Sequence, residues 1–212
     1  MFARRRATAM VAVLGVVAVA ALAACGGDSD PEPPPSPATT EPAVTAPPAL
    51  TPEEEAEAEI KATFEDLVAS WDAFKINASD YRDAAESTWN ADLVGTWPVE
   101  GQANLELTNW VAAWRNSAME QRAATAIRTH AVGDLSSDAD GTSPASATSS
   151  ACLDLTALKF VTYDGGEADL TFEPDLYQQW AMTWLHHESE TGGTQRAGWR
   201  VQSIELTRNE PC

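Results

Sequence analysis

Residues 51–75 read TPEEEAEAEIKATFEDLVASWDAFK and predict a long amphipathic helix at the start of the folded domain. Thr51 can cap this helix, Pro52 suits its first position, and Glu54 lies three residues after the cap, as in a capping box. Further glutamates fill the first turns, where the helix dipole favours acidic side chains. Apolar residues then recur at helical spacing and predict one buried stripe, which comprises Ile60, Phe64, Leu67, Val68, Trp71 and Phe74.

Two shorter helices are predicted after this one. Ser79 or Asp80 can cap the second helix, and Gly95 and Pro98 break the chain before the third. The third helix is expected from about Gln102 to Arg122. Its apolar stripe would consist of Leu107, Trp110, Val111, Trp114 and Ala118.

Beyond the third helix the apolar period changes from helical to alternating, which predicts strands. The expected strands cover residues 125–135, 146–163, 177–188 and 196–207. Alternation places Trp180, Met182, Trp184 and His186 on one face of the third strand, and Trp199, Val201 and Ser203 on one face of the last. Three helices followed by about four antiparallel strands predict an α+β fold, with the helices packed on one face of a curved, cone-like sheet.

This order of elements resembles the nuclear-transport-factor-2-like, or ketosteroid-isomerase-like, cone domain. The resemblance rests on the helix Pro52–Lys75, on the strand beginning Ala151-Cys152-Leu153-Asp154-Leu155, and on the closing Gly198-Trp199-Arg200-Val201-Gln202-Ser203-Ile204-Glu205. It implies a curved sheet with an open mouth, which such domains use for small apolar ligands, for catalysis or for partners. It also implies a possible homodimer through the open sheet face. A cysteine early in the middle strand and another at the C-terminus resembles exported actinobacterial lipoproteins with this fold.

The N-terminal residues predict export and membrane attachment. Arg4-Arg5-Arg6 precede an apolar stretch, and Leu22-Ala23-Ala24-Cys25 then resembles a bacterial lipoprotein lipobox. The resemblance implies a signal peptide at residues 1–24, acyl groups such as palmitate on Cys25, and a lipid anchor on the extracytoplasmic face of the cell membrane. Residues 25–50 are rich in proline and predict a disordered linker, so residues 51–212 form the domain.

The charge of the chain limits its partners. The net charge is −19, and the three arginines of the signal peptide are not offset by any acid there, so the exported part is more acidic still. Such a surface repels nucleic acid and anionic lipid headgroups. We therefore expect no nucleic-acid partner, and we expect the acyl chains on Cys25 to provide the membrane attachment.

Cys152 and Cys212 remain as an even pair in an oxidising compartment, which predicts a disulfide between them. The bond would close a loop of about sixty residues and stabilise the fold by about 4 kcal/mol. The alternative is a pair of free thiols, although no Cys-x-x-Cys motif or adjacent base supports a reactive site.

The candidate site is the mouth of the cone, which Trp180, Met182, Trp184 and Tyr177 could line as a surface for an apolar ligand. The same tryptophans could equally form the core beneath the helices. His186 and His187 point to opposite faces of a strand and cannot bind one metal together, so we expect no metal and no cofactor.

Three functions are compatible with these features. The first is a non-enzymatic binding or accessory module of the bacterial cell envelope, with an unknown envelope protein as partner. The second is a carrier or sensor of a small apolar ligand in the cone cavity. The third is an acid–base enzyme of isomerase type, for which no catalytic residue can be assigned. Its candidate groups would be the acids Asp154, Asp169, Glu188 and Glu205 and the donors Tyr163 and Tyr177.

Overall fold

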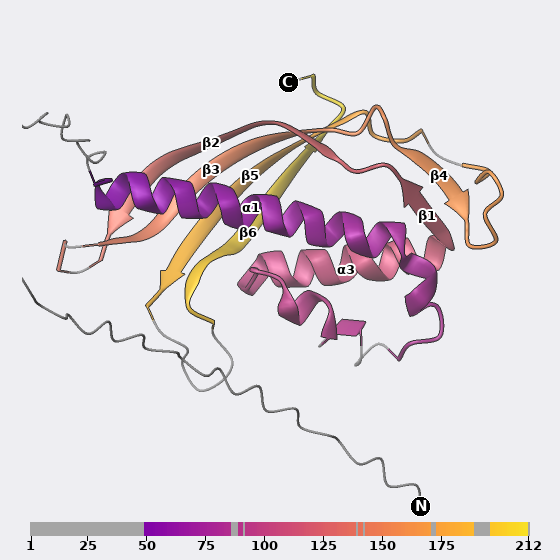
Figure 1. Cartoon of the computed structure of the whole chain (residues 1–212), viewed down its shortest axis with the longest axis horizontal. Coiled ribbons are helices and arrows are strands. Elements are labelled where there is room, and N and C mark those ends of the chain that lie inside the picture. Colours follow the sequence, from indigo (N-terminus) through magenta and orange to yellow (C-terminus); the bar gives the residue numbers. More distant parts are fainter. Residues whose placement is uncertain are drawn as a thin grey trace, which may run out of the picture. The chain divides into compact units, whose positions relative to one another are not determined.

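The computed structural model describes residues 49–85, 89–90, 92–138, 140–141, 143–170, 173–188 and 196–211. The chain divides into two compact units, 1–46 and 47–212, and the described residues belong to the second. The predicted signal peptide, Cys25 and almost all of the linker lie outside the described residues. The second unit has an α+β fold in which two helices lie on one face of a curved antiparallel sheet (Figure 1).

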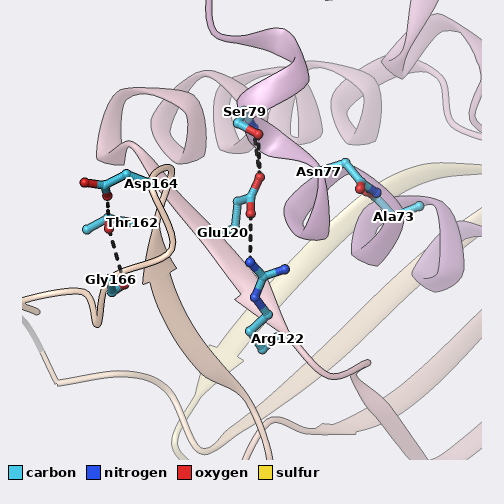
Figure 2. Close-up of polar contacts among 8 residues, drawn as sticks. All are labelled: Ala73, Asn77, Ser79, Glu120, Arg122, Thr162, Asp164 and Gly166. Carbon is cyan, nitrogen blue, oxygen red and sulfur yellow. Dashed lines mark hydrogen bonds and ion pairs between the residues drawn. The ribbon is translucent and has the colours of Figure 1, made fainter.

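The first predicted helix is confirmed as α1, Pro52–Ile76. Its capping box is complete, because the Glu54 backbone N–H donates to Thr51 Oγ1 at 3.2 Å and the Thr51 N–H donates to Glu54 Oε2 at 2.8 Å. All six residues of the predicted stripe are buried. The helix ends at Asn77, whose side-chain amide donates to the Ala73 carbonyl at 2.8 Å (Figure 2).

The second predicted helix does not begin where expected. A short 3₁₀ turn, η1 (Ala78–Tyr81), occupies its start, and a second, η2 (Val94–Thr96), follows later. The reason is visible at Ser79, whose hydroxyl donates to Glu120 Oε1 at 2.6 Å instead of capping a helix (Figure 2). Trp89, Asn90 and Asp92 are helical, but residues 86–88 and 91 lie outside the described part of the chain, so the second predicted helix is not confirmed there.

The third predicted helix is α3, Gly101–Ser117, and it stops well before the expected end at Arg122. Ala118 adopts a left-handed backbone with φ 53°, which reverses the chain at this point. The following residues form the strand β1, Met119–Arg122, which pairs antiparallel with β4, Lys159–Thr162. This two-stranded sheet, here called the ribbon, was not predicted.

The predicted strand 146–163 is two strands, β3 (Pro144–Asp154) and β4, separated by a turn. Asp154 Oδ1 accepts hydrogen bonds from the backbone N–H of Thr156 at 2.9 Å and from its hydroxyl at 2.6 Å. These two hydrogen bonds stabilise a turn after Asp154, and β3 ends there.

The main sheet has the order β2-β3-β5-β6, and all neighbours are antiparallel (Figure 1). Its other strands are β2 (Ala126–Ser137), β5 (Tyr177–His187) and β6 (Gly198–Arg208). The predicted alternation of β5 is confirmed: Trp180, Met182 and Trp184 are buried toward the helices, and the residues between them are exposed.

A β-bulge in β6 corrects the prediction for the last strand. Thr183 pairs with Ser203, but the next residue, Trp184, pairs with Val201, so Gln202 is left out of the register. Val201 therefore faces the core, whereas the Ser203 hydroxyl lies 2.6 Å from that of Thr183 on the opposite face. The start of α3 contacts β6 beside the bulge. There the Gln102 side chain forms hydrogen bonds with both the N–H and the carbonyl of Ile204.

Hydrogen bonds connect the ribbon to α1 and η1: Gln121 donates to Asp72 of α1 at 2.8 Å, and Ser79 of η1 donates to Glu120. Within the ribbon, Glu120 forms an ion pair with Arg122 at 3.3 Å (Figure 2). At the end of β4, the Thr162 hydroxyl contacts the Asp164 carboxylate and the Gly166 carbonyl, which closes the turn that follows. The ribbon thereby has a defined position beside the helices.

Candidate functional site

A pocket of about 350 Å³ lies between the C-terminal half of α1, α3, the ribbon and the ends of β3 and β6. Its walls are largely aromatic and aliphatic, with a few polar side chains at the base and the rim. The lining includes Trp71, Trp110, Trp114, Leu153, Leu155, Leu158, Phe160 and Leu206. We refer to it as the aromatic pocket.

Helical spacing places the aromatic side chains. Trp110 and Trp114 are four residues apart on α3 and so share one face, and Trp71 and Lys75 have the same spacing on α1. The ring centroid of Trp71 lies 6.3 Å from that of Trp110 and 6.4 Å from that of Trp114. The two helices thus present a tryptophan cluster to the pocket.

The ribbon forms a further wall. Because side chains alternate along a strand, Met119 and Gln121 of β1 face the pocket while Glu120 faces Ser79. Gln121 is opposite Phe160 in the β1–β4 register, and both line the pocket.

A buried ion pair lies at the base of the pocket. Lys75 Nζ is 3.0 Å from Asp72 Oδ1, and the two side chains are 6% and 7% exposed. Asp72 also accepts hydrogen bonds from the Thr125 N–H at 2.6 Å, from the Thr125 hydroxyl at 2.7 Å and from Gln121 Nε2 at 2.8 Å. Burial alone would raise the pKa of Asp72, but Lys75 and these hydrogen bonds outweigh it and lower that pKa.

Lys75 is a cation surrounded by aromatic rings. Its Nζ lies 5.2 Å from the centroid of Trp71 and 5.7 Å from that of Trp114, which stabilises the charge by cation–π contact. Burial lowers the pKa of Lys75, and the attraction of Asp72 opposes that shift. An ammonium has three N–H donors, and among the described residues Asp72 is its one hydrogen-bonding partner.

Two further polar atoms at this base have no hydrogen-bonding partner, namely Trp114 Nε1 and Gln121 Oε1. The orientation of the Gln121 amide follows from its contacts. Its Nε2 donates to Asp72 and to the Ala123 carbonyl, and a flipped amide would place an oxygen against both acceptors. Buried polar groups are nearly always paired, so these unpaired atoms in pocket-lining residues need an explanation, and a bound ligand would supply one.

The residues proposed from the sequence as cavity-lining lie elsewhere. Trp180, Met182 and Trp184 are between 1% and 2% exposed and do not line the aromatic pocket. Trp180 packs edge-on against Phe64 of α1 at 6.0 Å, which supports the alternative that these side chains form the core. Tyr177 is partly buried under the Arg128 guanidinium, 5.4 Å from its ring centroid, and is also outside the pocket.

The residues that do line the pocket were not predicted as a site. Trp71, Trp110 and Trp114 were assigned to helical stripes, with core packing as the expected role. One feature of the sequence could have indicated the pocket. Asp72 and Lys75 place two charges beside Trp71, within a helical stripe that is otherwise apolar.

The acids and tyrosines considered for isomerase chemistry are not brought together here. None of the four acids and neither tyrosine lines the aromatic pocket. Thr156 and Arg128 lower the pKa of Asp154 to about 2, so this carboxylate is a poor base. Asp169, Glu188 and Glu205 are exposed.

The two adjacent histidines have separate surroundings, as the alternation of a strand predicts. His187 Nε2 lies 2.9 Å from Glu100 Oε2, whereas the His186 ring packs on Trp199 at 5.2 Å. Within the part of the chain that the structure describes, no group of three or more His, Cys, Asp or Glu side chains could hold a metal ion.

Cys152 is buried in β3 and is disulfide-bonded. Cys212 lies outside the described residues, so the pairing of these two cysteines stays a prediction. The same applies to acylation of Cys25.

No protein-family model matches the chain. A search of the curated proteins also finds no match. Among the residues with a described position, no helix is both long and apolar enough to cross a membrane.

Proposed function

We propose that this protein is a lipid-anchored carrier or sensor of a small, largely apolar molecule, which it holds in the aromatic pocket. The observation that carries the proposal is the pocket itself: about 350 Å³ lined by three tryptophans, with unpaired polar atoms at its base. Ligand sites in proteins are commonly concave and mostly apolar, with a few polar groups that orient the ligand. Its volume is near the lower end of the usual range, about 300 to 1,000 Å³, and suits a small ligand.

The polar side chains on the outer face of the sheet favour ligand binding over the first of the three functions, the protein-interaction module. A docking face of that kind would carry a contiguous apolar patch. The large apolar side chains that are exposed among the described residues are Leu50, Leu105 and Leu176, and none of them lies on the main sheet. The exposed positions of β5 and β6 include instead Ala181, Thr183 and Glu205.

The chemistry of the base supports binding over acid–base catalysis. An isomerase-type site needs a carboxyl group whose pKa is raised toward neutrality. The carboxyl group at this base, Asp72, has a lowered pKa, and each of its oxygens already accepts a hydrogen bond. It is therefore suited to position Lys75 rather than to exchange protons with a substrate.

The proposed cellular setting follows from the N-terminal sequence. Acylation at Cys25 would attach the chain to the outer face of a bacterial membrane, and residues 26–50 would connect the anchor to the domain. A site in the cell envelope can collect apolar molecules that pass between membrane and surroundings. A homodimer through the sheet remains a separate prediction of the resemblance.

The experiment is to block the pocket at its mouth. Ala113 is an exposed residue of α3 that lines the pocket, so Ala113→Trp adds bulk there without removing a polar group. Asn109→Trp is the matched control, because Asn109 is exposed on the same helix but does not line the pocket. The assay uses the chain from Gly26, which contains the whole compact unit 47–212.

Quenching of tryptophan fluorescence by 2-methylnaphthalene would report binding. We expect saturable quenching for the parent and for Asn109→Trp, and a loss of at least tenfold in affinity for Ala113→Trp. Equal affinity in all three proteins, or no saturable binding in any of them, would refute the proposed function.

A further inference from the structure

The base of the aromatic pocket has more free hydrogen-bonding capacity than its own residues use. Asp72 is satisfied, since four hydrogen-bonding contacts reach its two oxygens. Lys75 is not satisfied, because only one of its three N–H donors has a protein partner among the described residues. Trp114 Nε1 adds another unused donor, and Gln121 Oε1 adds an unused acceptor.

These unused groups belong to residues that line the same pocket. Lys75 Nζ is 5.7 Å from the Trp114 ring centroid, and Asp72 Oδ1 contacts both Lys75 Nζ and Gln121 Nε2. Gln121 is fully buried and lines the pocket, as do Lys75 and Trp114. Trp114 Nε1 and Gln121 Oε1 are shielded from solvent, so a ligand group must displace neighbouring side chains to meet these two kinds of donor and one acceptor.

Both charged pairs at the pocket, Lys75 with Asp72 and Arg208 with Asp175 at 3.7 Å, are already neutralised, which disfavours ionic head groups. The Lys75 cation is already neutralised by Asp72 at 3.0 Å. A carboxylate on the ligand would lie near the Asp72 carboxylate and the Gln121 carbonyl oxygen, which both repel it. An ammonium would meet Lys75, which already occupies the faces of Trp71 and Trp114 that such cations use.

We propose that the pocket recognises an uncharged head group that presents an oxygen acceptor beside an N–H donor, as a primary carboxamide does, on an apolar body. The head-group oxygen accepts from Lys75 and Trp114, and its N–H donates to Gln121 Oε1. The apolar body fills the space between Trp110, Leu155 and Phe160. This inference rests on the proposed function, and it adds the chemical class of the ligand.

The test compares four naphthalene derivatives with the same ring system and different substituents: 2-naphthamide, 2-naphthoate, naphthalen-2-ylmethylammonium and 2-methylnaphthalene. Isothermal titration calorimetry at pH 7.5 measures their affinities for the chain from Gly26. We expect 2-naphthamide to bind about tenfold more tightly than 2-methylnaphthalene, because two or more net hydrogen bonds separate them. The carboxylate and the ammonium should bind more weakly than the amide by at least the same factor.

Two variants separate the head-group contacts from the pocket walls. Trp114→Phe keeps an aromatic ring but removes the N–H, so it should weaken 2-naphthamide about threefold to tenfold and leave 2-methylnaphthalene within about twofold. Phe160→Leu is the control, since Phe160 lines the same pocket and has no polar side-chain atom. It should change both ligands by the same factor.

Each alternative result has a definite meaning. Equal affinities for the amide and the hydrocarbon, or tighter binding of the carboxylate or the ammonium, would overturn the head-group assignment and leave the proposed function in place. The same holds if Trp114→Phe affects both ligands as Phe160→Leu does. Failure of all four compounds to bind would overturn the proposed function together with this inference.

Discussion

The ion pair beneath the pocket makes a quantitative prediction for Asp72→Asn. The substitution keeps the shape of the side chain and an oxygen that can accept from Thr125, but it removes the charge 3.0 Å from Lys75. Lys75 is then a buried cation whose remaining stabilisation comes from the rings of Trp71 and Trp114. Removing one partner of a buried pair costs about 3 to 5 kcal/mol. The cation–π contacts are present in the parent protein as well and cancel in the difference, so we expect a loss of about 3 to 5 kcal/mol.

The loss should depend on pH in a direction that identifies its cause. Burial lowers the pKa of Lys75 in the folded state, and without Asp72 that pKa falls further below the unfolded value of about 10.4. The unfolded chain then binds the extra proton, so stability rises with pH between the folded and unfolded pKa of Lys75. The deficit of Asp72→Asn should therefore shrink on the alkaline side, as Lys75 becomes neutral in the folded state.

The assay is urea unfolding followed by tryptophan fluorescence at pH 6, 7.5 and 9. Asp72→Asn/Lys75→Met removes the unpaired cation and should recover most of the loss. Glu57→Gln is the control for a charge removed from an exposed pair with Lys61, and it should cost less than about 1 kcal/mol. The reasoning is refuted if the double variant is no more stable than Asp72→Asn, or if the deficit does not vary with pH.

Two other predictions concern stability. Burial, with a smaller contribution from Lys61, lowers the pKa of His130 to about 4, and neither ring nitrogen has a partner. The neutral ring is therefore favoured in the folded state, and its contribution is complete above about pH 6.5 and is lost as the pH falls toward 4. Because His130 is partly exposed to solvent, we expect a loss of about 1 to 2 kcal/mol over that window. His130→Phe should flatten the unfolding curve there, and an unchanged acid sensitivity would contradict this. For the predicted disulfide, Cys212→Ser should lower the free energy of unfolding by about 4 kcal/mol under non-reducing conditions. Peptide mapping without reduction should recover Cys152 and Cys212 in one linked fragment, and linkage of Cys152 to Cys25 instead would show that the pairing is wrong.

Local chemistry explains which elements could be predicted. The helix α1 begins where Thr51 and Glu54 complete a capping box, and both residues act within one turn of chain. The strand β5 shows its two faces directly in the alternation of Trp180, Ala181 and Met182. Neither feature needs information from a distant part of the chain.

The errors share a different cause. Ser79 was expected to cap a helix, but its hydroxyl bonds to Glu120, a residue 41 positions later. The strand Met119–Arg122 has no marked alternation, and it exists because β4 pairs with it across the ribbon. In the same way the bulge at Gln202 lies beside a long-range contact, because Gln102 of α3 bonds the backbone of Ile204. Contacts between distant residues decided each of these features.

The amino-acid sequence by itself determined the α+β class, the position of the first helix and the buried faces of α1 and β5, because periodicity and capping act over a few residues. It also carries the predictions of export and acylation at Cys25. The tertiary structure alone decided that Trp71, Trp110 and Trp114 line a pocket while Trp180 and Trp184 fill the core. Periodicity shows which side of a helix turns away from water. Periodicity does not show whether that side packs in a filled core or lines a pocket. That outcome depends on the positions of the ribbon and of the strand ends in the tertiary structure.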